Sequence, residues 1–181
     1  MKLHPPLAAL LIAAASISSF AETRKPLGPL VVVDAAGRTV GRFGGSFQHL
    51  HTDALAKGVY ATINGALVAI QMSSCYGPGD GISTTFCWGA GRVFFGSSDC
   101  TGPVMIESSI FGAGAPVNEV LRTTPGGPAF LYIASGPMTL KQYNSIQDMN
   151  GCYAVSGSAQ IFDAAAPIDL STMFTERFHI E

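Results

Sequence analysis

The chain has 181 residues, of which 48% are hydrophobic and only 12% charged, and it contains 21 glycines and 11 prolines. Because a chain this apolar can offset its ordering entropy by burial, a disordered protein is excluded, and the glycines lack the collagen period of three. Lys and Arg number 10 against 12 Asp and Glu, so the formal net charge of -2 excludes nucleic-acid binding driven by a basic surface.

The first 21 residues have the pattern of a secretory signal peptide. Lys2 and His4 precede an apolar run over residues 7–17, and Ser19 and Ala21 place small residues where signal peptidase reads them. A membrane anchor is the alternative, but this run is well short of the roughly 20 residues that a spanning helix needs. We expect cleavage after Ala21, export to the periplasm or the extracellular space, and one domain over residues 22–181 without a transmembrane segment.

A turn sequence separates the first two apolar segments of the mature chain, residues 30–33 and 38–43. Asp34 suits the first position of a type I turn, because its side chain can accept hydrogen bonds from the turn amides. Gly37, in fourth place, can adopt the left-handed conformation that starts a bulge. The segment therefore predicts a β-hairpin.

A second hairpin is indicated by Asn64-Gly65, the two-residue sequence typical of a type I′ turn, between two apolar segments. Pairing Ile63 with Ala66 across this turn fixes the register of both strands. In that register six apolar side chains share one face, which we expect to face the core: Val59, Ala61, Ile63, Ala66, Val68 and Ile70.

Short apolar segments bounded by Gly or Pro continue to the C-terminus, as is typical of strands. They cover residues 92–95, 104–107, 117–122, 129–134, 152–155 and 159–162. Residues 138–149 fit both helical and alternating spacing, and we favour a strand. Asp169 can cap one helical turn over residues 169–174, before an extended tail. About ten short antiparallel strands predict an all-β sandwich or barrel.

The cysteines predict disulfides that staple this fold. All of them, Cys75, Cys87, Cys100 and Cys152, lie in the exported part, where thiols tend to pair. We favour Cys75 with Cys87, which brackets a Gly-rich loop, and Cys100 with Cys152, which ties the middle of the chain to late strands. A zinc site is the alternative, but the chain has no C-x-x-C pair. We therefore expect no cofactor.

His49, His51 and Asp53 form an H-x-H-x-D pattern. It resembles the metal-binding segment of metallo-β-lactamase-type hydrolases, in which two histidines chelate one zinc and the aspartate helps place a second metal or a water. Here Ala54 stands where those enzymes continue with His, and only His179 lies downstream. We favour an exposed polar loop, with a small secreted metal-dependent hydrolase as the alternative function.

Other catalytic patterns are weaker. No G-x-S-x-G elbow supports a serine triad, and cysteines that form disulfides supply no thiol nucleophile. Carboxylate pairs for glycoside hydrolysis meet only in three dimensions. The sequence singles out no such pair among Asp99, Glu107, Glu119 and Asp148. We therefore assign no catalytic residue.

Residues 77–91 predict a long Gly-rich hairpin loop, with Tyr76 at its edge and Asp80, Phe86 and the only tryptophan, Trp88, within it. Long loops on rigid β scaffolds often carry recognition, and aromatic faces can stack on sugar rings or hold a partner protein. The four named residues are our candidate binding loop. The alternative, which we favour for Phe86 and Trp88, is that they are core residues of a strand.

Three segments resemble an uncharacterised group of secreted bacterial β-rich proteins. The first is an opening V-x-D-x-x-G-x-x-V-G hairpin, the second the Asn64-Gly65 hairpin, and the third an S-x-D-C-x-G-P segment within residues 95–103. In this chain the opening hairpin is read at Val32, Asp34, Gly37, Val40 and Gly41. The resemblance implies a β-rich exported domain and transfers no functional residue.

Together these features favour a secreted or periplasmic, disulfide-bonded β module with a binding or structural role over an enzyme. We expect its partner to be an envelope protein or glycan, contacted through the loop that holds Trp88. A passive subunit that assembles through an exposed sheet edge is a further interpretation.

Overall fold

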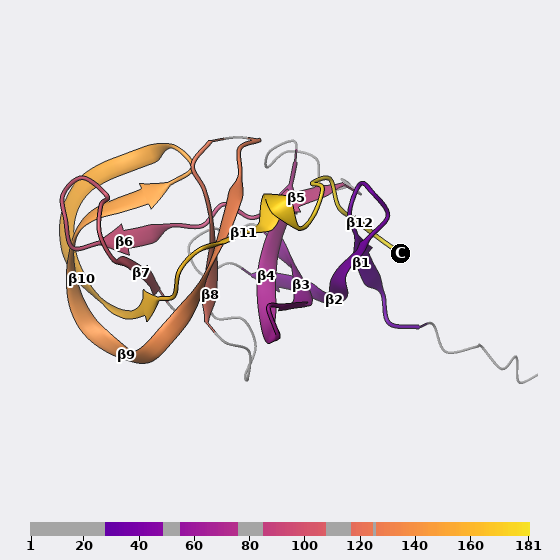
Figure 1. Ribbon diagram of the computed structural model, residues 1–181, viewed down its shortest axis with the longest axis horizontal. Helices are drawn as coiled ribbons and strands as arrows, with labels where there is room; N and C mark the ends of the chain where they lie inside the picture. Colours follow the sequence, from indigo (N-terminus) through magenta and orange to yellow (C-terminus); the bar gives the residue numbers. More distant parts are fainter. Residues whose placement is uncertain (1–27, 49–54, 76–84, 108–116, 125) are drawn as a thin grey trace, which may run out of the picture.

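The computed structural model describes residues 28–48, 55–75, 85–107, 117–124 and 126–181. The predicted all-β fold is confirmed: two sheets lie side by side along the long axis of the molecule (Figure 1). The first sheet contains β1 (Val31–Val33), β2 (Thr39–Gln48), β3 (Leu55–Ile63), β4 (Ala66–Ser74), β5 (Phe86–Trp88) and β12 (His179–Ile180). The second contains β6 (Val93–Phe95), β7 (Val104–Glu107), β8 (Asn118–Arg122), β9 (Ala129–Asp148), β10 (Gly151–Ala164) and β11 (Ile168–Asp169).

The first sheet closes on itself. Its strand order is β12-β1-β2-β3-β4-β5, and Phe178, just before β12, forms an antiparallel bridge with Phe86 of β5. The Phe86 N–H donates to the Phe178 carbonyl at 2.8 Å, and the Phe178 N–H donates to the Phe86 carbonyl at 2.7 Å. Because the C-terminal segment pairs with both β5 and β1, the strands form a ring that lacks the exposed edges of an open sheet.

The two hairpins predicted from turn residues are both present in this ring. Gly37 has a φ of 77° in the turn between β1 and β2. In the β3–β4 hairpin Asn64 and Gly65 both have positive φ, and Ile63 pairs with Ala66. The face predicted to be apolar is buried, since Val59, Ile63, Val68 and Ile70 are fully covered, Ala61 is nearly so and Ala66 packs against them.

The second sheet also forms a ring of strands. β9 pairs with β10, β10 with β7, β7 with β6, and β6 with the far end of β9. β8 and β11 pair with the first residues of β9 and lie on the side of the ring that faces the first sheet (Figure 1). β8 therefore separates two cores, with Val120 in the core of the first sheet and Leu121 in that of the second.

The strand boundaries after residue 128 need a correction. The segments expected at residues 129–134 and 138–149 are one strand, β9, and those at 152–155 and 159–162 are one strand, β10. Gly136 and Pro137 read as a break in the sequence, but they lie in a bulge where the β9–β10 register shifts. A bulge tolerates both the positive φ of Gly136, 80°, and the missing N–H of proline, so the strand continues through them.

Both favoured disulfides are present. Cys75–Cys87 joins the end of β4 to β5, and Cys100–Cys152 joins the loop between β6 and β7 to the start of β10. No free cysteine remains in the described residues. The expected helical turn is a short 3-10 helix, η1 (Leu170–Thr172), and the Asp169 side chain caps it by accepting from the Ser171 N–H. Each sheet is thus closed by hydrogen bonds and stapled by one covalent bond.

A fully buried carboxylate connects the two ends of the chain. Asp34 Oδ1 accepts from the Ala36 and Arg38 N–H groups, at 2.9 and 2.8 Å. Asp34 Oδ2 accepts from the Arg38 guanidinium and, at 2.9 Å, from the Thr175 N–H of the C-terminal segment. Burial alone would raise the pKa of Asp34, but these hydrogen bonds outweigh it and lower the pKa to about 2.

We predict that Asp34→Asn lowers the free energy of unfolding by roughly 2 kcal/mol at pH 7, because it removes a buried charge that three backbone N–H groups and the Arg38 guanidinium stabilise. Since the folded pKa lies below the unfolded one, the wild-type contribution is present above about pH 4 and is lost as the pH falls towards 2. Urea unfolding between pH 2 and pH 7 measures both effects. Asp163→Asn, at an exposed carboxylate, is the control and should change stability by less than about 0.5 kcal/mol.

Candidate functional site

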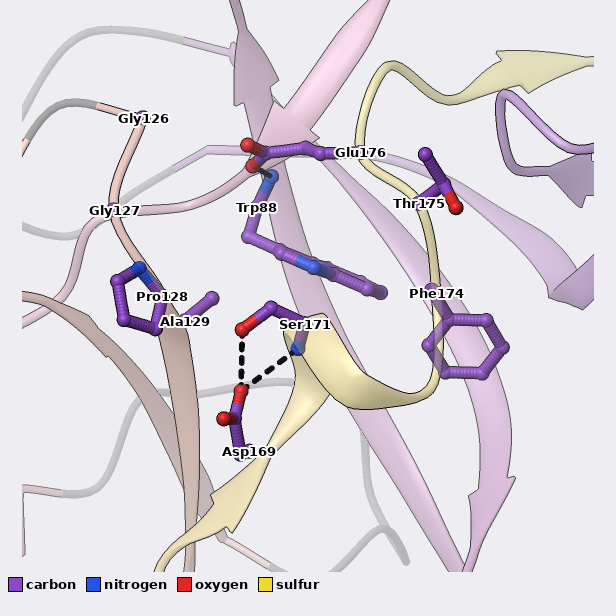
Figure 2. Close-up of a pocket in the computed structure, with 10 residues that line it drawn as sticks. All are labelled: Trp88, Gly126, Gly127, Pro128, Ala129, Asp169, Ser171, Phe174, Thr175 and Glu176. Carbon is purple, nitrogen blue, oxygen red and sulfur yellow. Dashed lines mark hydrogen bonds between the residues drawn. The ribbon is translucent and has the colours of Figure 1, made fainter.

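A pocket of about 470 Å³ lies where the two sheets meet (Figure 2). Trp88 of β5 contributes the wall from the first sheet. The turn before β9, the cap of η1 and residues 174–176 of the C-terminal segment contribute the others. Its lining includes the side chains of Trp88, Pro128, Asp169, Ser171, Phe174 and Glu176. A pocket of this size, with an apolar lining and a few polar groups, has the dimensions of a small-molecule site.

Trp88 is a core residue that forms the inner wall of the pocket. It is only 2% exposed, and its ring lies 4.3 Å from that of Phe178 and 5.9 Å, edge to face, from that of Phe174. Phe86 is buried as well. The interpretation of these two residues as core residues of a strand is therefore confirmed, because β5 is a strand of the ring and turns them into its core. Tyr76 and Asp80 lie outside the described residues.

A partly buried ion pair supports the upper side of the pocket. Arg122 Nη1 donates to Glu176 Oε1 at 2.7 Å, and Nη2 donates to Glu176 Oε2 at 2.9 Å. Glu176 Oε1 also accepts from the Trp88 N–H at 3.0 Å, as Figure 2 shows. The side chain of Arg122 is only 9% exposed. A two-point contact in these surroundings fixes the direction of both side chains and neutralises their charges locally.

Asp169 and Ser171 form the lower side of the pocket. Asp169 Oδ1 accepts from the Ser171 N–H at 2.9 Å and from the Ser171 hydroxyl, and both contacts are drawn in Figure 2. The Asp169 carbonyl accepts from the Thr172 hydroxyl at 2.8 Å. This is the arrangement of a helix cap, and it holds the carboxylate at the pocket wall.

Two buried donors beside the pocket have no hydrogen-bond acceptor within the described part of the chain. They are Nε1 of the Trp88 indole and Nε of the Arg122 guanidinium. A buried polar group without a partner costs about 1–3 kcal/mol, so native structures rarely keep one without a reason. The site therefore combines aromatic surface and a fixed carboxylate, and the two unpaired donors lie buried behind its wall.

A second group of acids lies on the opposite face of β8. Glu119 packs against the backbone at Gly91, where an added Cβ would come 1.7 Å from Oε1 of Glu119. Burial raises the pKa of Glu119 to about 8, opposed by the Val120 N–H and the positive charge of Arg92, and assisted by the negative charge of Glu107. Arg92 itself pairs with Glu107 at 2.8 Å. The folded environment of Glu119 therefore favours its protonated form.

The structure thus brings together two of the acids that the sequence could not pair, Glu107 and Glu119. A protonated acid beside an ionised one is an arrangement that glycosidases use. Here the Glu119 carboxyl is covered by the chain at Gly91 and lies outside the pocket, so we interpret it as a buried structural acid. Asp99 and Asp148 stabilise local turns. Asp99 accepts a hydrogen bond from the Thr101 hydroxyl, and Asp148 accepts one from the Asn150 N–H.

The proposed metal ligands His49, His51 and Asp53 lie outside the described residues, so the hydrolase alternative stays a prediction. Within the described ranges, no three His, Cys, Asp or Glu residues are grouped closely enough to hold a metal ion. Nor does this part of the chain contain a helix with the length and hydropathy to span a membrane. Comparison of the chain with family models, curated proteins and solved structures finds no match.

The sequence singled out two residues of this pocket, each for a different reason. It proposed Trp88 for recognition and Asp169 as a helix cap, but it did not bring the two together. It missed Arg122 and Glu176, which are far apart in the chain and belong to no motif. No local pattern marks a pair of this kind, because only the closure of the first sheet brings the C-terminal segment beside β8.

We predict that Glu119→Gln stabilises the protein increasingly as the pH rises from 5 to 8. The wild-type group binds a proton when folded and releases it when unfolded in this range, so its contribution to stability falls by roughly 1 kcal/mol per pH unit. Glutamine is neutral throughout and removes that slope. Thermal unfolding across this pH range measures the difference, and Glu181→Gln, at an exposed acid, should leave the slope unchanged.

Proposed function

We propose that this protein is an exported, disulfide-bonded binding module whose ligand occupies the pocket between the two sheets. The support for export is the signal-peptide pattern of residues 1–21 and the two disulfides, which form and persist in oxidising compartments such as the periplasm and the extracellular space. The resemblance to secreted bacterial proteins points the same way. The disulfides also suit a module that must stay folded outside the cell.

The single observation that carries the binding role is the composition of the pocket. Its polar groups are held in place by contacts from different strands: Arg122 of β8 fixes Glu176, and the η1 cap fixes Asp169. Groups whose positions are fixed before a ligand arrives lose little entropy when it binds, which favours affinity. The aromatic rings of Trp88 and Phe174 add apolar contact area.

Binding is favoured over catalysis by the way in which the two pocket carboxylates are used. Both oxygens of Glu176 accept hydrogen bonds from Arg122, and one also accepts from the Trp88 N–H. A carboxylate committed in this way is a poor general acid or base, since proton transfer would break the ion pair that orients it. Asp169 Oδ1 accepts from Ser171 as the cap of η1, and the described residues of the lining include no histidine, lysine or cysteine to serve as a base or a nucleophile. The arrangement supports recognition of a ligand that leaves unchanged.

We predict that ligands of the pocket change the fluorescence of Trp88, the only tryptophan of the chain. A panel of oligosaccharides, dipeptides, polyamines and phosphorylated sugars is titrated while emission is recorded, and amide NMR shifts locate each site. Phe174→Ala should weaken any ligand found by about tenfold, because it removes a ring that walls the pocket. The protein should stay folded, since Phe174 lies only partly buried at the margin of the core.

Phe162→Ala is the matched control, because Phe162 is also a partly buried phenylalanine but packs in the second core, away from the pocket. It should leave affinity unchanged. Shifts that map to another surface, or a panel in which no compound perturbs the lining residues, would contradict the proposed site.

A further inference from the structure

Residues 175–181 fill a slot between β1 and β5, the two strands that end the row β1 to β5 of the first sheet (Figure 1). On the β5 side, Phe178 and Phe86 exchange two hydrogen bonds. On the β1 side, the Val31 N–H donates to the Glu181 carbonyl at 3.0 Å, and the Glu181 N–H donates to the Val31 carbonyl at 2.9 Å. Proteins that bind a peptide by strand addition use main-chain pairing of this kind. Here the segment is paired on both sides.

One side chain anchors the segment in the slot. Phe178 is fully buried, and its ring lies 4.3 Å from that of Trp88. A single buried aromatic residue among exposed neighbours is typical of the anchor of a bound peptide. Four other residues of the segment are exposed: Thr175, Arg177, His179 and Glu181.

The groups that receive the segment are held in place by contacts with other parts of the chain. Asp34, which accepts from the Thr175 N–H, also accepts from the Ala36 and Arg38 N–H groups of its own turn. β1 pairs with β2, and β5 pairs with β4 and is tied to its end by the Cys75–Cys87 disulfide. A slot built in this way can receive the same residues from any copy of the protein with every contact retained.

One tight turn links the segment to the rest of the chain. Leu170 is buried in the core of the first sheet, and the Met173 and Phe174 N–H groups both donate to its carbonyl, at 3.1 and 3.0 Å. If this turn opens, residues 171–174 can extend over about 13 Å. A tight hinge favours exchange between copies, because a chain that bends back to its own slot can instead run straight into the slot of a neighbour.

We propose that the slot between β1 and β5 is a strand-binding site for residues 175–181 of a second copy of this chain, so that two copies exchange these segments. The partner is a second copy because the slot is occupied by this sequence, and exchange retains the contacts that close the sheet. In the exchanged pair, Glu176 of one copy meets Arg122 of the other, and each copy supplies part of the other's pocket wall. The inference goes beyond the proposed function and needs no ligand in the pocket.

The test mixes two variants of the full chain, Val32→Cys and Ile180→Cys, whose positions lie opposite each other in the β1–β12 pair. In the mixture, a disulfide between these two positions links two chains, and strand exchange raises the effective concentration of the two thiols. After incubation just below the unfolding transition in a glutathione buffer, the linked dimer should be at least about tenfold more abundant than in a control mixture. The control pairs Val32→Cys with Leu67→Cys, at an exposed position of β4 outside the slot. Peptide mapping identifies the bond.

A synthetic peptide of residues 173–181 should suppress the linked dimer, because it competes for the slot. The same peptide with Phe178→Ala should need a concentration at least about a hundredfold higher, since it lacks the ring that fills the core. If Val32→Cys does not fold, a mixture of Val31→Cys and Glu181→Cys tests the same pairing at positions that are less buried. The exchange is overturned by a linked dimer no more abundant than in the control mixture, or by one that the peptide does not suppress.

Discussion

The pairing of the C-terminal segment with both edges of the first sheet is the interaction on which the rest of this structure depends. Phe178 bridges to Phe86 of β5, the next two residues pair with β1, and the Thr175 N–H is held by the buried carboxylate of Asp34. Without these contacts β1 and β5 would be free edges, and the core around Trp88 would lie open on the side that Phe178 covers. Asp34 is important for this pairing because its carboxylate accepts hydrogen bonds both from its own turn and from the C-terminal segment.

The same segment creates the pocket. Between Thr175, which Asp34 fixes, and Phe178, which enters the core, the chain passes through Glu176 and Arg177. Arg177 has a φ of 83°, a conformation that is costly for a residue with a side chain. Firm attachment on both sides of Arg177 holds it there. The local bend accompanies the change from Glu176, which faces Arg122 and the pocket, to Phe178, which is fully buried. The same segment therefore closes the first sheet and supplies one wall of the pocket.

Local chemistry predicted the strands well and the site poorly. The Asn64-Gly65 turn fixed the β3–β4 register, because a two-residue turn sets the pairing of the residues beside it. The favoured disulfide pairing is also the one present. Gly136 was misinterpreted as a strand end, since a sequence does not distinguish a turn glycine from a bulge glycine. Arg122 and Glu176 left no signal at all, because a long-range ion pair depends on how two sheets pack. The aromatic character of Trp88 suggested recognition, but its burial follows from β5 joining the ring.

On the proposed binding role, β8 would couple ligand binding to folding. One face of this strand carries Arg122 towards the pocket, and the other carries Glu119 into the second core, so β8 belongs to the packing of both sheets. The pocket is walled by Trp88 from the first sheet and by Asp169 from the second. A ligand that contacts both walls binds only when the sheets are packed together, and by mass action it stabilises that arrangement over any state in which they separate. On that proposal, affinity at the pocket depends on the packing of the two sheets, and a change that loosens the C-terminal segment at Asp34 should weaken binding without removing a ligand contact.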